Sequence, residues 1–64
     1  MNVKFKKTVA ADYLNRWGEM ETQTFNRGSR SDSVNVLDNG NWVDIEFDNG
    51  AVAYNIPKDS IEIC

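Results

Sequence analysis

Apolar and polar residues alternate over residues 34–56, and two Asn-Gly dipeptides divide this stretch into three segments. Asn-Gly between alternating segments is a strong hairpin signal, because a two-residue type I′ turn needs positive φ at both central positions. The pattern therefore predicts a three-stranded antiparallel meander with turns at Asn39-Gly40 and Asn49-Gly50.

The two turns also predict which side chains share the buried face. Counting outward from them gives five apolar cross-strand pairs: Phe47–Val52, Ile45–Tyr54, Val43–Ile56, Val36–Val43 and Val34–Ile45. All of these residues fall on one face, because successive side chains of a strand point to opposite faces. A slip of one residue would move the apolar set to solvent, so the register is well specified.

The segment before the meander gives a less uniform pattern. Val3 and Phe5 alternate with lysines and predict a strand. Residues 10–20 have helical spacing of apolar side chains, but Gly18 interrupts the run, so a short helix and a long hairpin-like loop both fit. A short strand is expected at 22–25, then a turn at 26–29 and an exposed, mobile polar segment at 30–33.

The end of the chain predicts two further elements. Pro57 lacks an N–H and ends the third strand, and residues 57–60 suit one turn of 3₁₀ helix. Ile61 and Ile63 alternate around Glu62 and predict a final short strand. The whole chain is therefore expected to be mainly β.

Length and composition narrow the class of protein. The 64 residues are expected to form one small domain, residues 1–64. Cys64 is the only cysteine and histidine is absent, so neither an intrachain disulfide nor a zinc site is expected to hold the fold. The lack of disulfides favours a reducing compartment. Neither an apolar run long enough to span a membrane nor a signal-peptide pattern occurs, so a cytoplasmic protein is expected.

Charge is distributed unevenly along the chain. Residues 1–30 hold six of the seven cations against three anions, whereas residues 31–64 hold one cation against seven anions. The net charge is −3. Such asymmetry can mark an interaction surface, although a mixed solvated surface is the simpler interpretation.

Four short motifs resemble those of the Src-homology-3 family of five-stranded β-barrels. Val9-Ala10-Ala11-Asp12-Tyr13 resembles the family's motif at the start of its long first loop, and Gln23 to Gly28 resembles its diverging turn. Asn41-Trp42 stands where the family has a tryptophan at the opening of the third strand, and Ile56 to Ile61 resembles its 3₁₀ segment. The resemblance covers residues 9–61 and implies a five-stranded barrel. The chain is also similar to Tudor and KOW-type modules of bacterial and phage proteins, especially over residues 43–50.

The departures from the Src-homology-3 pattern concern its peptide groove. Tyr13, Trp42 and Pro57 match the groove residues, but Ala11 and Ser60 stand where the family has tyrosines. The resemblance therefore implies the fold without the proline-rich ligand.

A non-enzymatic protein-binding role is the first expectation. Trp42 is expected beside Leu37 on the face opposite Val43, and tryptophan is frequent among interface hot spots. Alternatively, residues 10–30 cover Trp42 and Leu37 and bury both side chains. The expected partner-binding residues are Trp42, Leu37, Tyr13, Glu19, Glu21 and Asp44. In size and charge the chain resembles small acidic phage or mobile-element accessory proteins that bind or inhibit a host protein.

Catalysis is not expected from this set of residues. The chain has no histidine, and its alternating carboxylates at positions 44, 46 and 48 suit a solvated strand face. A metal site at Asp38, Asp44 and Asp48 would be shallow, so neither a metal nor a cofactor is expected.

Two alternatives remain open. The first is nucleic-acid binding through the basic half, with tyrosine and tryptophan available for stacking; its residues are Lys4, Lys6, Lys7, Arg16, Arg27 and Arg30. A sequence pI of about 4.6 argues against it. The second is a small homo-oligomeric structural protein, since domains of this size often gain stability by association.

Overall fold

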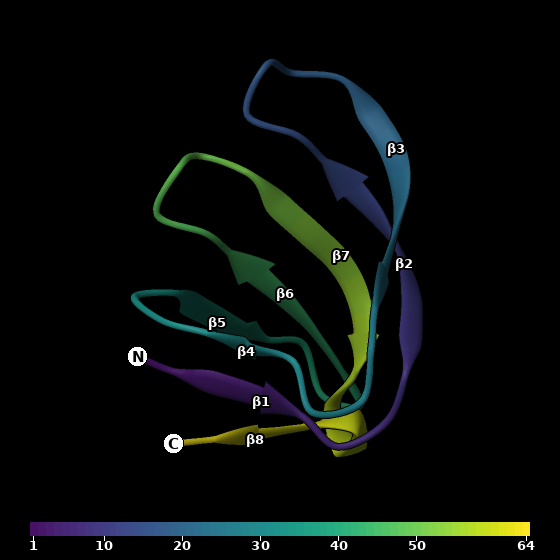
Figure 1. Ribbon diagram of the computed structural model, residues 1–64, viewed down its shortest axis with the longest axis vertical. Helices are drawn as coiled ribbons and strands as arrows, with labels where there is room; N and C mark the ends of the chain where they lie inside the picture. Colours follow the sequence, from purple (N-terminus) through teal and green to yellow (C-terminus); the bar gives the residue numbers. More distant parts are fainter.

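The computed structural model covers residues 1–64 and consists of two antiparallel sheets (Figure 1). Their strands are β1 (Val3–Phe5), β2 (Val9–Leu14), β3 (Met20–Phe25), β4 (Arg30–Ser31), β5 (Asn35–Asp38), β6 (Trp42–Glu46), β7 (Val52–Pro57) and β8 (Ile61–Ile63). The order is β4-β1-β8 in the smaller sheet and β3-β2-β7-β6-β5 in the larger one. The strands do not close into a single barrel, which corrects the expected barrel, although an antiparallel five-stranded sheet is present.

The predicted central meander is confirmed as β5, β6 and β7. The predicted 3₁₀ turn is also confirmed, at η1 (Lys58–Ser60), and leads directly into the predicted last strand β8. The structure contains no helix with the length and apolar character needed to cross a membrane.

The turn between β6 and β7 differs from the prediction. The Phe47 N–H donates to the Ala51 carbonyl (2.8 Å), and the Gly50 N–H donates to the Phe47 carbonyl (3.1 Å). Gly50 has a φ of 91°, whereas Asn49 keeps a negative φ. The loop therefore has three residues, as in a type I turn followed by a glycine bulge, and the predicted two-residue type I′ turn is wrong.

The extra loop residue shifts the register of β7. Ile45 lies opposite Ala53, and Glu46 lies opposite Val52. Ala53 is fully buried, whereas Tyr54 is only half-buried. The predicted pairs Ile45–Tyr54 and Phe47–Val52 are therefore wrong, because a shift of one residue exchanges the two faces of a strand.

A bulge restores the predicted register further along β7. Asn55 has a φ of 56°, and its N–H donates to Asp44 Oδ1 (3.0 Å). The inserted residue returns Ile56 to the inner face, so the predicted pair Val43–Ile56 is confirmed.

The first turn of the meander keeps the predicted face but not the predicted pairs. The Asn39 N–H donates to the Trp42 carbonyl (2.8 Å), which leaves Gly40 and Asn41 as the loop residues. Val36 consequently lies opposite Ile45 instead of Val43. Because the shift is two residues, the inner and outer faces of β5 are unchanged.

Residues 9–25 form a long hairpin, so the helical alternative is wrong. β2 pairs with β3 from Val9–Phe25 to Leu14–Met20, and β2 also pairs with β7. The tip repeats the β6–β7 turn: the Asn15 N–H donates to the Glu19 carbonyl, and the N–H of Gly18, at a φ of 83°, donates to the Asn15 carbonyl. The expectation that residues 30–33 are exposed and mobile is also wrong in part, because Arg30 and Ser31 form β4 against β1.

The core lies between the two sheets. Its buried residues come from both sheets and from the segment before β5, and are Val3, Phe5, Ala11, Val34, Val43, Ile45, Ala53, Ile56 and Ile61. Val3 and Phe5 are fully buried, as the alternation of β1 predicts. Phe5 lies parallel to Phe25, with ring centroids 4.8 Å apart, and thereby joins the smaller sheet to the larger one.

The shifted register of β7 makes Ala53 a sensitive position. We expect Ala53→Leu to lower the free energy of unfolding by about 1–3 kcal/mol, because a larger side chain has no space opposite Ile45. Ala10→Leu is the matched control, since Ala10 is exposed on β2, and should change it by less than about 0.5 kcal/mol. Urea unfolding measures both, and equal effects would contradict the observed register.

Candidate functional site

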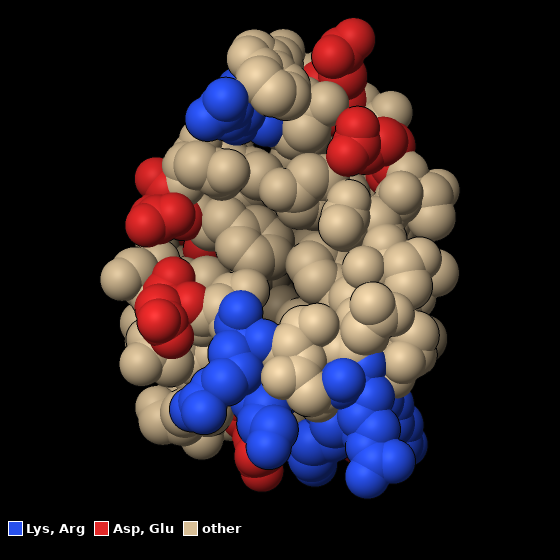
Figure 2. Space-filling view, in the orientation of Figure 1, with Lys and Arg blue, Asp and Glu red and all other residues tan.

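A groove of about 300 Å³ opens between the tip of the β2–β3 hairpin and the β6–β7 loop. The space-filling view shows the molecule hollowed in this region (Figure 2). Nine side chains line it: Tyr13, Asn15, Arg16, Trp17, Glu21, Gln23, Phe25, Phe47 and Asn49. We call it the aromatic groove.

The floor of the aromatic groove is a set of packed rings. Phe25 and Phe47 are parallel, with centroids 6.1 Å apart, and the Tyr13 ring meets both of them edge-on at 6.2 and 5.9 Å. These separations lie in the range in which aromatic pairs attract one another. Since Phe25 also stacks on the fully buried Phe5, the floor is held by the core.

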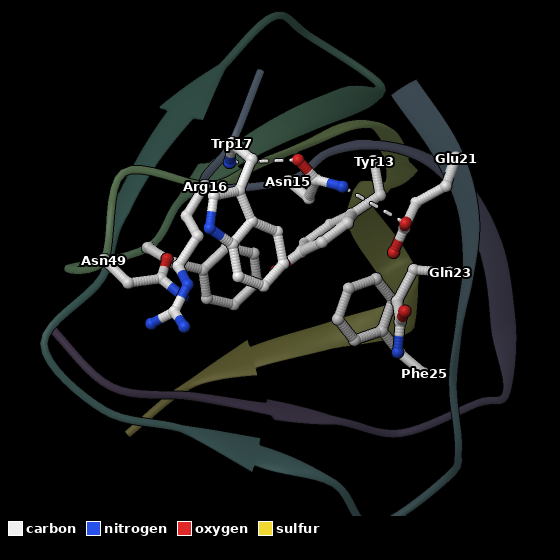
Figure 3. A pocket seen from close by; sticks show the side chains of 9 residues that line it. Tyr13, Asn15, Arg16, Trp17, Glu21, Gln23, Phe25 and Asn49 are labelled. Atoms are coloured by element: carbon white, nitrogen blue, oxygen red, sulfur yellow. Dashed lines mark hydrogen bonds between the residues drawn. The ribbon is translucent and has the colours of Figure 1, made fainter. Parts of the chain in front are cut away.

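The hairpin tip that carries Trp17 is organised by Asn15. Its Oδ1 accepts hydrogen bonds from the N–H groups of Trp17 and Glu19, both at 3.0 Å. Its Nδ2 donates to the carboxylate of Glu21 at 3.3 Å (Figure 3). Asn15 is itself nearly buried. Because its side chain bonds to two backbone N–H groups of the loop, it fixes the loop that carries Trp17.

Trp17 forms the exposed rim of the groove. Its side chain is 72% exposed, and the Arg16 guanidinium lies 4.5 Å from the ring centroid. Figure 3 shows the Arg16 side chain running beside the indole, with the rings of Tyr13 and Phe25 further inside. A cation over an indole face is attractive and limits the positions that both side chains adopt.

The predicted partner-binding residues divide between the two faces of the larger sheet. Trp42 and Leu37 are 50% and 45% exposed on the outer face, and Asp44 lies beside them. They are not covered by residues 10–30. Tyr13 and Glu21 line the aromatic groove on the inner face instead, and Glu19 lies at the hairpin tip.

The residues that match the Src-homology-3 groove divide in the same way. Trp42 lies opposite Pro57 on neighbouring strands, whereas Tyr13 lies in the aromatic groove. The predicted surface is thus two surfaces, because the sequence does not reveal that β2 pairs with β7 and turns Tyr13 inward.

Most of the predicted basic residues gather at the opposite end of the molecule. Lys4, Lys6 and Arg27 line one shallow opening, and Arg30 lies opposite Lys4 on β4. Figure 2 shows this accumulation of basic side chains at the lower end. We call Lys4, Lys6, Arg27 and Arg30 the basic end.

The two other predicted basic residues have different surroundings. Lys7 forms an exposed ion pair with Asp59 (3.3 Å), and Arg16 lies on Trp17 at the far hairpin tip. The structure therefore brings together four of the six residues.

The acidic residues do not form a metal-binding group. No cluster of three or more histidine, cysteine, aspartate or glutamate side chains is suitably placed for a metal ion. Asp38 instead binds Lys58 and accepts a hydrogen bond from the Gly40 N–H (2.9 Å), and these two contacts lower the pKa of its carboxyl group.

The predicted site residues include only Tyr13, Arg16 and Glu21 of the groove. The six others are Asn15, Trp17, Gln23, Phe25, Phe47 and Asn49. The sequence predicts Phe25 and Phe47 only as strand or core positions, and both do pack against the core. A usable signal existed for Asn15, because Asn followed three residues later by Gly is typical of a turn with the side chain bonded to the backbone.

The Asp38–Lys58 contact gives a test of the electrostatics. We expect the carboxyl pKa of Asp38 to lie below its usual 3.8 and to rise towards it in Lys58→Met, without reaching it because the Gly40 N–H still binds the carboxylate. The contribution of this contact to stability is present above the unfolded-state pKa and is lost as pH falls through the folded-state pKa.

Carbon-detected NMR titration measures the midpoint. Lys7→Met is the matched control, since Lys7 binds Asp59 and should leave the Asp38 midpoint unchanged. An unchanged midpoint in Lys58→Met would show that Lys58 has no influence on the carboxylate.

Comparison with protein-family models, curated proteins and solved structures gives no match for this chain. The resemblance to Src-homology-3 barrels accordingly stays an expectation from the sequence, beside an observed fold of two antiparallel sheets.

Proposed function

We propose that the chain is a non-enzymatic protein-binding module, and that the aromatic groove holds an apolar or aromatic side chain of the partner. The observation that carries the proposal is the exposed Trp17 above a floor of three packed rings. Tryptophan, tyrosine and arginine are the residues most enriched at binding hot spots, and the groove contains one of each.

The rigid floor supports this role energetically. Binding costs free energy when mobile side chains become ordered, and rings already fixed against one another avoid much of that cost. The Asn15 contacts likewise order the hairpin tip before a ligand arrives.

The polar residues of the groove can orient a bound side chain. Glu21, Gln23 and Asn49 are exposed around the rings and offer hydrogen-bond donors and acceptors. An apolar floor with few polar groups at its edge is typical of sites that bind one side chain in a fixed orientation. The likeness to Src-homology-3 modules agrees with an interaction role, but only by analogy of fold.

The groove can be tested with peptides displayed on phage and selected against the immobilised protein. We expect enriched peptides to contain a large apolar or aromatic residue and to bind Trp17→Ala about tenfold more weakly, as at a typical hot spot. Thermal unfolding should change little, because Trp17 is mostly exposed.

Trp42→Ala is the matched control, since it removes an equally large exposed side chain from the outer face. It should fold normally and keep full peptide affinity. The opposite outcome, with binding lost in Trp42→Ala and kept in Trp17→Ala, would place the contact on the outer face with Leu37 and Asp44.

A second candidate function is nucleic-acid binding through the basic end. The specific support is that Lys4, Lys6, Arg27 and Arg30 are neighbours, although the chain is acidic overall. Such a patch would contact phosphates, and its affinity would fall steeply with salt.

Fluorescence anisotropy with single-stranded and duplex oligonucleotides tests this candidate. If it holds, wild-type protein binds at low salt and the variant Lys6→Glu/Arg27→Glu does not. Arg16→Glu should bind normally, because Arg16 lies at the other end of the molecule. The absence of binding by wild-type protein at low salt would exclude this function.

A further inference from the structure

The strand β3 is an open edge of the larger sheet. It is last in the strand order and pairs only with β2. Its residues from Met20 to Thr24 are exposed, and Phe25 is half-buried. The strand contains neither proline nor lysine, and Glu21 is its one charged residue.

The hydrogen bonding of the hairpin shows which backbone groups of β3 are free. The Asn15 N–H donates to the Glu19 carbonyl, so Asn15–Glu19 is a hydrogen-bonded pair. Hydrogen-bonded and non-hydrogen-bonded pairs of facing residues alternate along two antiparallel strands. Met20, Thr22 and Thr24 therefore direct their N–H and C=O groups away from β2, towards the open side.

We infer that this edge binds the β3 edge of a second copy of the chain, in an antiparallel pair centred on Gln23. Thr22 of each copy then lies opposite Thr24 of the other, and the free backbone groups of both residues bond to each other. Facing threonines are favourable cross-strand neighbours.

Charge selects this register. The free backbone groups belong to the even-numbered residues of β3, so a matching register must place even-numbered residues of the two copies opposite each other. Two such registers, centred on Thr22 or on Gln23, pair most of β3. Centring on Gln23 brings Glu19, at the hairpin tip of each copy, next to the 26–29 turn of the other copy, which carries Arg27. Centring on Thr22 places Glu19 opposite Phe25, without a charge partner.

Glu19 and Arg27 are available for this contact. Both are exposed, and the two ion pairs within the chain are Lys7–Asp59 and Lys58–Asp38. The pairing would thus bring two oppositely charged pairs together, each just beyond one end of the shared ladder.

Pairing would also bring the two aromatic grooves together. Glu21, Gln23 and Phe25 line the groove and point to the inner face of β3. A twofold axis between antiparallel strands is perpendicular to the sheet, so both inner faces lie on the same side. The two grooves would then flank the axis on one continuous sheet.

Disulfide trapping tests the register. In a Cys64→Ser background, which removes the single free cysteine, Gln23→Cys should form a linked dimer under mild oxidation. The two residues would face each other at a non-hydrogen-bonded position, where Cα atoms lie about 4.5 Å apart, within reach of a disulfide.

Thr22→Cys and Glu21→Cys are the matched controls on the same strand. In the inferred register the two copies of residue 21 would be about 14 Å apart, and those of residue 22 about 7 Å apart along the strand, so neither should link. Linkage through Thr22→Cys but not Gln23→Cys, or no linkage by any of them, would overturn the inference.

Charge reversal tests the contact without a crosslink. By sedimentation equilibrium we expect Glu19→Arg or Arg27→Glu alone to raise the dimer dissociation constant about tenfold, because two favourable pairs become repulsive. The double variant should recover wild-type association. A wild-type chain that stays monomeric at all concentrations, or a dimer indifferent to both reversals, would overturn the inference.

Discussion

The stacking of Phe5 on Phe25 is the contact on which the rest of the structure depends. Phe5 belongs to the smaller sheet and Phe25 to the larger one, and their nearly parallel rings fill the space between the sheets. Phe47 and Tyr13 continue the same set of rings towards the surface. Since a chain of 64 residues buries a smaller share of its surface on folding than a longer chain does, a few large aromatic contacts supply much of its cohesion.

The same rings connect stability to the proposed function. A ring column that begins in the core and ends in an open groove gives the groove a rigid floor, so a ligand would meet a surface that is already ordered. The hairpin tip is ordered separately, by the hydrogen bonds of Asn15. Core packing and local turn chemistry thus fix the two sides of the groove by different means.

The charge asymmetry of the sequence is only partly an asymmetry in space. The cations of β1, β4 and the 26–29 turn meet at one end because β1 pairs with β4. Arg16 is carried to the other end by the β2–β3 hairpin. Lys58, near the end of the chain, is held by Asp38, and Lys7 is held by Asp59. Pairing of distant segments, which composition does not encode, decides which charges act together.

The sequence by itself determined the local elements. Alternation placed Val3, Phe5, Val43, Ile45 and Ile56 in the core, and turn residues located the meander and the 3₁₀ turn, because these depend on neighbouring residues. Only the tertiary structure decided the register of β7, where a three-residue loop and the bulge at Asn55 buried Ala53 in place of Tyr54. It also decided the groove, since the pairing of β2 with β7 and the packing of Phe25 on Phe5 join residues that are distant along the chain.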